Sequence, residues 1–93
     1  MVVGIMVVEL RISEADSLKS KRRILKSLVE KIKSRFNVSI AEVGKQNAWQ
    51  FSTLGVSVVS NNSSHAYQML NALLRFIEGA GTVELLDVQM EVL

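Results

Sequence analysis

The stretch from Ser17 to Phe36, SLKSKRRILKSLVEKIKSRF, decides which fold this sequence can adopt. Its apolar residues recur at the three- and four-residue spacing of a single helix face. The residues on this face are Leu18, Leu25, Leu28, Val29, Ile32 and Phe36. Ser17 or Asp16 can cap the first amide groups, and Asn37 can end the helix in the left-handed conformation. We therefore predict one amphipathic helix over residues 17–36.

Strand-forming segments lie on both sides of this helix. Val2–Ile12 is rich in β-branched residues and ends in the polar turn Ser13–Asp16. Val38–Val43 is a short apolar run after the helix, and Gly44–Asn47 fits a hairpin loop that leads into a third strand over Trp49–Ser60. The first two-thirds of the chain therefore predict the order strand, helix, strand, strand.

The remainder of the chain repeats the pattern of helix followed by strand. Asn61–Ser64 offers several caps for a second helix over Ser64–Glu78, Gly79–Gly81 stops that helix, and Thr82–Val92 forms a last strand. Two strand–helix–strand units joined by a hairpin predict a ferredoxin-like βαββαβ fold of the α+β class in one domain, residues 1–93. Right-handed crossovers place the first and third strands at the centre of a four-stranded antiparallel sheet, with both helices on one face.

Alternation along the strands indicates which side chains face the helices. The side chains that we assign to the helix-covered face of the sheet are Met6, Val8, Leu10, Ile12, Leu54, Val56, Val58, Leu86, Val88, Met90 and Val92. On the second helix we expect Tyr67, Leu70, Leu73, Leu74 and Ile77 to point inward.

The opposite face of the sheet is expected to be too apolar to stand bare in water. It would carry Val3, Ile5, Val7, Trp49, Phe51, Val59 and Leu85. We predict a homo-oligomer interface on this face, with Val3, Ile5, Val7, Trp49 and Phe51 as its candidate residues. Base stacking on the sheet is less favoured, because the first strand offers no aromatic side chain.

Composition excludes several classes of site. The chain has no Cys and a single His, so neither a thiolate nucleophile nor a Cys- or multi-His metal site can form within it. We predict no cofactor and no enzymatic activity, since the turn Ser13–Asp16 is acidic and lacks the glycines and the Arg that acylphosphatase chemistry needs. We expect no signal peptide and no membrane segment, and hence a cytoplasmic protein.

Charge is distributed unevenly along the chain. The window Lys19–Arg35 holds eight basic residues and one acid, Glu30, so it carries +7, and the rest of the chain carries −5. Five of these cations fall on one helical stripe opposite the apolar one: Lys19, Arg22, Arg23, Lys26 and Lys33. Such a stripe can neutralise several phosphates and favours a nucleic-acid partner such as structured RNA. The alternative is an ordinary solvated helix face.

Lys21 departs from this stripe, because its helical angle places it among the apolar residues. A lysine there must extend to water or find a partner. A salt bridge to Glu42 or Asp16 is one prediction, and contact with a ligand is the other. We therefore also include Lys21 among the RNA-binding candidates.

Several segments of the chain resemble the YlxP-like family of small bacterial proteins. The similar segments are Ser17-Leu18-Lys19, Lys21-Arg22, Arg35–Ser39, Ala41–Val43, Gln46, Trp49-Gln50, Leu54-Gly55 and Val59–Asn61. The resemblance implies a ferredoxin-like fold and genes beside translation-initiation and ribosome-maturation factors, and it implies no catalytic residues. The loop departs from the family pattern, with Gly44-Lys45 in place of Asp-His, Asn47 in place of Asp and Phe51 in place of Arg.

Two functional hypotheses follow. The first is a small accessory protein that binds RNA or a ribosomal particle through the basic helix. The second is a homo-oligomeric protein–protein adaptor without a nucleic-acid partner.

Overall fold

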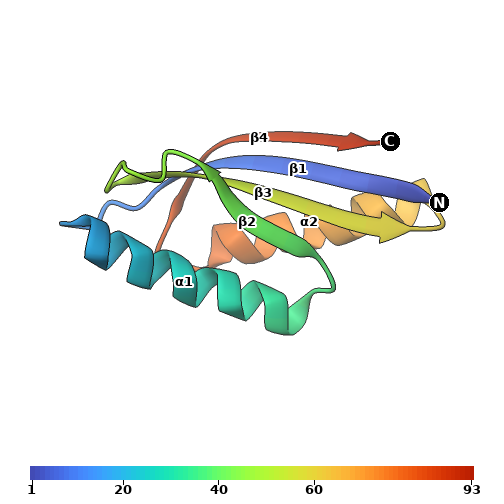
Figure 1. Cartoon of the computed structure of the whole chain (residues 1–93). Helices are drawn as coiled ribbons and strands as arrows, with labels where there is room; N and C mark the ends of the chain where they lie inside the picture. The colour runs from blue at the N-terminus through green and yellow to red at the C-terminus, as the bar shows by residue number, and fades with distance from the viewer.

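The computed structural model describes all 93 residues, and both helices lie against one face of a single antiparallel sheet (Figure 1). The six elements follow the predicted order: β1 (Val2–Arg11), α1 (Leu18–Arg35), β2 (Ser39–Gly44), β3 (Phe51–Ser60), α2 (Ser63–Gly79) and β4 (Glu84–Val92). The strands lie in the order β2-β3-β1-β4, and every neighbouring pair is antiparallel. The predicted central position of the first and third strands is confirmed.

The ends of the helices are set by local hydrogen bonds. The Ser17 Oγ accepts from the Ser20 amide at 3.0 Å, and the Ser20 Oγ accepts from the Ser17 amide at 3.2 Å, which completes a capping box at the start of α1. The other end differs from the prediction for Asn37. The chain leaves α1 through an extended Phe36 (φ −126°) and enters β2 without a left-handed residue.

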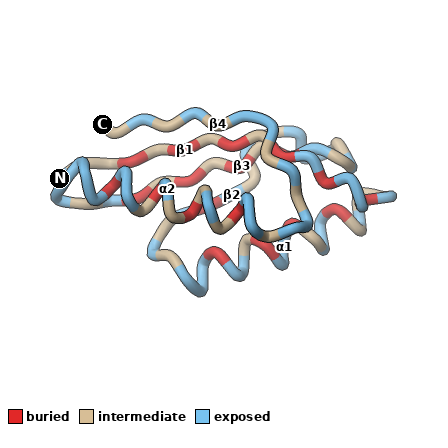
Figure 2. The backbone as a smooth tube through the Cα atoms, turned by 180° about the vertical axis from the view of Figure 1, so that it is seen from behind, coloured by how far each residue is buried: buried red, intermediate tan, exposed pale blue.

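The core lies between the sheet and the buried sides of the two helices, which appear as regularly spaced red segments in Figure 2. On α2 the buried residues are Ala66, Leu70, Leu73 and Ile77. Tyr67 is exposed, so its predicted inward position is wrong. Close approach of α2 to β1 is the reason: a Cβ on Gly4 would lie 3.5 Å from the Ala66 Cβ and only 3.0 Å from Leu70 Cδ1, both on α2. Such a narrow gap admits alanine and excludes tyrosine.

A β-bulge changes the alternation in β4. Met6 lies opposite Met90 and Val8 opposite Val88, but the register shifts between Glu9 and Leu10, so that Leu10 lies opposite Leu85. Leu85 therefore packs against the core, and Leu86 is exposed. The sequence-based assignment of these two leucines to the two faces is wrong, because one extra residue on a strand reverses the phase of its side chains.

Candidate nucleic-acid interface

The basic face of α1, which we define as Lys19, Arg22, Arg23, Lys26 and Lys33, is exposed at all five positions. The opposite side of the helix carries its buried residues, Lys21, Leu25, Leu28 and Ile32. Leucine and isoleucine packing against the sheet thus fixes the rotation of α1 about its axis and directs the five cations to solvent. The structure places the five candidates on one surface, as the helical spacing predicts.

Carboxylates neutralise little of this surface. The only ion pair on α1 that involves the basic face joins Lys26 Nζ and Glu30 Oε1 at 4.0 Å, and both side chains are largely exposed. Such a pair contributes little in water. The other three ion pairs of the molecule involve Arg11, Lys21 and Lys45, none of which belongs to the basic face. Four of its five cations therefore lie more than 4.0 Å from any carboxylate.

Lys21 does not contribute to the basic face, and its inclusion among the RNA-binding candidates is wrong. Its side chain is 0% exposed. The Nζ donates to the backbone carbonyls of Lys45, at 2.7 Å, and of Ala48, and it lies 3.0 Å from Glu42 Oε2. The predicted ion pair with Glu42 is confirmed. Three acceptors satisfy the three ammonium protons, so no donor remains for a ligand.

Two carboxylates, Glu42 on β2 and Glu9 on β1, connect neighbouring strands through hydrogen bonds. Glu42 also accepts a hydrogen bond from Ser52 Oγ at 2.6 Å, which connects β2 to β3. On β1, Glu9 pairs with Lys45 Nζ and accepts from Thr53 Oγ1 at 2.8 Å. The hydrogen bond from Lys45, followed by that from Thr53, lowers the pKa of the Glu9 carboxyl below its ordinary value of 4.5. Lys45 therefore helps to attach the β2–β3 loop to the sheet, a role that no sequence signal indicated.

The β2–β3 loop, residues 45–50, is held at several points. Lys45 adopts the left-handed conformation (φ 58°), and its carbonyl accepts from the Ala48 amide at 3.0 Å in addition to Lys21. Gln50 accepts at its backbone carbonyl from the Ile12 amide at 2.7 Å, and its side-chain amide donates to the Ala15 carbonyl at 3.4 Å. Trp49 belongs to this loop and not to β3, contrary to its predicted place on the strand.

The uncovered face of the sheet is apolar over only part of its length. Val3, Ile5 and Val7 are partly exposed, and Val59 lies opposite Val3. Further along β1 the face becomes polar at Glu9 and Arg11, and Phe51 lies opposite Arg11. The structure therefore groups Val3, Ile5 and Val7 and separates them from Phe51 by Glu9 and Thr53. The candidate interface residues therefore do not form one continuous apolar patch.

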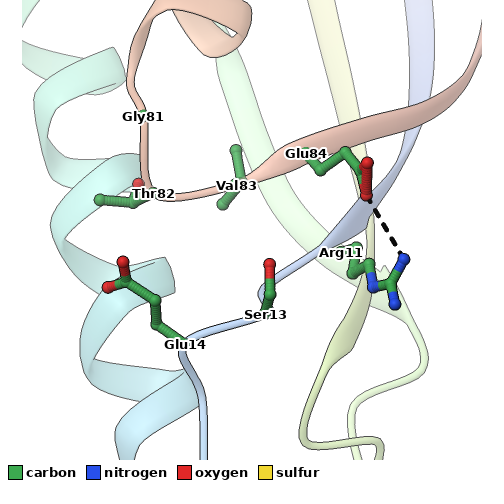
Figure 3. A pocket seen from close by; sticks show the side chains of 7 residues that line it. All are labelled: Arg11, Ser13, Glu14, Gly81, Thr82, Val83 and Glu84. Carbon is green, nitrogen blue, oxygen red and sulfur yellow. Dashed lines mark ion pairs between the residues drawn. The ribbon is translucent and has the colours of Figure 1, made fainter.

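A hollow at the end of the sheet is shown in Figure 3, where the turn after β1 faces the turn before β4. Its Arg11 lies 3.6 Å from Glu84, and Glu14 brings a second acid. One paired cation beside two acids does not favour an anionic ligand.

No cluster of three or more His, Cys, Asp or Glu side chains suited to a metal ion is present. Neither helix has the length and apolar composition required to cross a membrane.

Comparison with known proteins supports both the fold and the resemblance seen in the sequence. Two designed proteins have similar structures at 14% sequence identity and a TM-score of 0.54, and this similarity shows the fold alone. They are the de novo designed protein Foldit4, for which the match covers 100% of this chain and 97% of that one, and the de novo designed protein LFR1 1 with ferredoxin fold, for which it covers 99% and 84%. The ferredoxin-like fold is thus confirmed.

Two further comparisons concern the family. The uncharacterized protein YlxP of Bacillus subtilis (strain 168) is 35% identical over 82 residues, which span 88% of this chain and 89% of that protein. The model of a family described as protein of unknown function (DUF503) matches residues 3–90. The similarity to YlxP runs through almost the whole fold that carries the basic face, the buried lysine and the loop, and the chain belongs to the DUF503 family of proteins of unknown function.

Proposed function

We propose that this protein is a small accessory protein that binds RNA, either free or in a ribosomal particle, through the basic face of α1. The observation that carries the proposal is the set of five exposed cations on one helix face, of which only Lys26 has a carboxylate within ion-pair distance. Solvated helix faces usually mix charges of both signs, because i,i+4 pairs stabilise the helix. On the α1 surface Glu30 is the single acid.

The shape of α1 suits a phosphate backbone. From Lys19 to Lys33 the helix axis extends about 21 Å, at a rise of about 1.5 Å per residue. Cations spaced along this length can each displace counterions from a phosphate, which favours binding without reading the base sequence. The role in translation or ribosome assembly comes from the resemblance to YlxP-like proteins, and a cytoplasmic location would follow from it.

We infer a binding role and not a catalytic one. The anion-binding loop of the acylphosphatases requires glycines and an Arg after the first strand. In this chain that turn holds Glu14 and Asp16, whose charges repel phosphate.

Salt dependence of RNA binding tests the proposal. The affinity for a blunt RNA duplex, followed by fluorescence anisotropy, is expected to fall linearly on a log–log plot between about 50 mM and about 200 mM salt. If all five cations contact phosphates, the slope should be about −4.5. An affinity that is undetectable at the lower salt concentration, or that salt leaves unchanged, would contradict the proposal.

The second candidate function is a homo-oligomeric adaptor. It is supported by the apolar part of the uncovered sheet face, where Val59 is 64% exposed beside the partly exposed Val3 and Ile5. Aliphatic side chains in such an arrangement are common in subunit interfaces. Sedimentation velocity decides this candidate, since a wild-type protein that remains monomeric over the accessible concentration range excludes it.

A further inference from the structure

We infer that Trp49 stacks on an unpaired base, so that the preferred ligand is RNA in which a single-stranded segment adjoins the backbone contacted by α1. This inference rests on the function proposed above and names the class of RNA that the surface fits. It combines the exposure of Trp49, the anchoring of its neighbours and its place beside the first turns of α1.

Trp49 is unusually exposed for a large aromatic residue. It is the single tryptophan of the chain, and 51% of its surface remains accessible. An isolated exposed apolar side chain needs no explanation by itself. The loop that carries Trp49, however, is not a loose surface segment.

Both neighbours of Trp49 are fixed to the body of the protein. On one side, the Ala48 carbonyl accepts from the buried Lys21 Nζ, and the Ala48 amide donates to the Lys45 carbonyl at 3.0 Å. On the other side, Gln50 bonds to the backbone of Ile12 and of Ala15. The backbone on either side of the indole is therefore held before any ligand binds, which lowers the entropy lost on binding.

The loop and the basic face lie at the same end of the molecule. Figure 1 shows the β2–β3 loop close to the start of α1. Lys21 establishes this contact directly, because it belongs to α1 and binds the loop at Lys45 and Ala48. Its sequence neighbour Arg22 and the nearby Lys19 are exposed cations of the basic face. The loop and the first cations of the basic face thus lie at the same end of α1, the loop on the buried side of the helix and the cations on its exposed side. An RNA that contacts both would pass around the start of α1.

The chemistry of the loop favours an unpaired base over a duplex. An indole can stack only on a base whose face is free, and such bases occur in loops, bulges and ends of RNA. Gln46 and Asn47 are also exposed in this loop, and side-chain amides can both donate to and accept from base edges. A blunt duplex offers phosphates to α1 but no unpaired base to Trp49, and only its terminal pairs have a free face.

Intrinsic fluorescence gives a direct test, because Trp49 is the only source of tryptophan emission. A short RNA hairpin with a single-stranded loop is expected to quench this emission, whereas the blunt duplex of the same stem should leave it unchanged. Trp49→Ala is expected to weaken hairpin binding about tenfold to hundredfold. The affinity for the blunt duplex should stay the same, and Trp49→Phe should restore most of the hairpin affinity.

The outcomes separate this inference from the proposed function. If neither RNA binds, the proposed function fails and the inference with it. If both RNAs bind with the expected salt dependence but Trp49→Ala binds the hairpin as tightly as wild type does, only the inference fails. A change of Trp49 emission with protein concentration in the absence of RNA would place Trp49 in a protein interface and would likewise overturn it.

Discussion

Replacement of Lys21 by Met is expected to lower the free energy of unfolding by about 3–5 kcal/mol, the usual cost of removing one partner of a buried ion pair. The substitution leaves Glu42 with a charge and only the Ser52 hydroxyl as partner. It also removes the donor from the Lys45 and Ala48 carbonyls in the loop. Since small domains are stable by about 5–15 kcal/mol, a loss of this size is a large part of the total.

Urea denaturation followed by circular dichroism measures this effect, and Lys19→Met is the matched control. Lys19 is exposed on the same helix and belongs to no ion pair, so the control should change stability by no more than about 0.5 kcal/mol. The double variant Lys21→Met with Glu42→Gln identifies the cause. Recovery of stability in the double variant assigns the cost to the uncompensated Glu42 charge, and no recovery assigns it to the loop carbonyls. A Lys21→Met protein as stable as the control would contradict the prediction.

Charge reversal on the basic face is expected to reduce affinity for a blunt RNA duplex by about a hundredfold or more. The variant combines Arg22→Glu, Arg23→Glu and Lys26→Glu. Each lost phosphate contact should make the salt slope shallower by about one, and each new carboxylate repels the backbone. The fold should persist, since all three side chains are exposed and the Lys26–Glu30 pair contributes only about 0.3–0.5 kcal/mol.

A single-residue pair controls for net charge alone. Arg23→Glu and Arg75→Glu make the same chemical change at exposed positions, one on the basic face and one on α2. We expect Arg23→Glu to weaken binding and Arg75→Glu to leave it nearly unchanged. Equal losses of RNA affinity in the two variants would mean that binding depends only on the net charge of the molecule and not on where the cations lie. Retention of wild-type affinity by the triple variant would exclude the basic face as the binding surface.

Most of the fold could be predicted from local patterns. The spacing from Leu25 to Ile32 indicated the buried side of α1, and alternation from Met6 to Leu10 indicated the core side of β1. Errors arose where packing between elements outweighed the pattern. The bulge in β4 exchanged Leu85 and Leu86 between the two faces, and the close approach of α2 at Gly4 favoured Ala66 over Tyr67.

The candidate site was predictable in part. Helical spacing alone placed the five exposed cations on one face, and it also separated Lys21 from them. It could not distinguish a buried lysine from one that reaches a ligand, because the partners of Lys21 lie 24 and 27 positions away in the sequence. Likewise, an alternating pattern continued Trp49 into the strand, although β3 begins only at Phe51.

The sequence by itself determined the order of the six elements, the polarised charge and the helical stripe that carries it, since each depends on periodicity within one segment. The tertiary structure decided which groups the buried Lys21 ammonium binds, and that Trp49 lies in the β2–β3 loop and not on a strand. The Lys21 ammonium binds loop carbonyls that only the folded chain brings to it, and burial without water makes those bonds necessary. The basic helix α1 is thus joined through its buried side to the loop that presents Trp49.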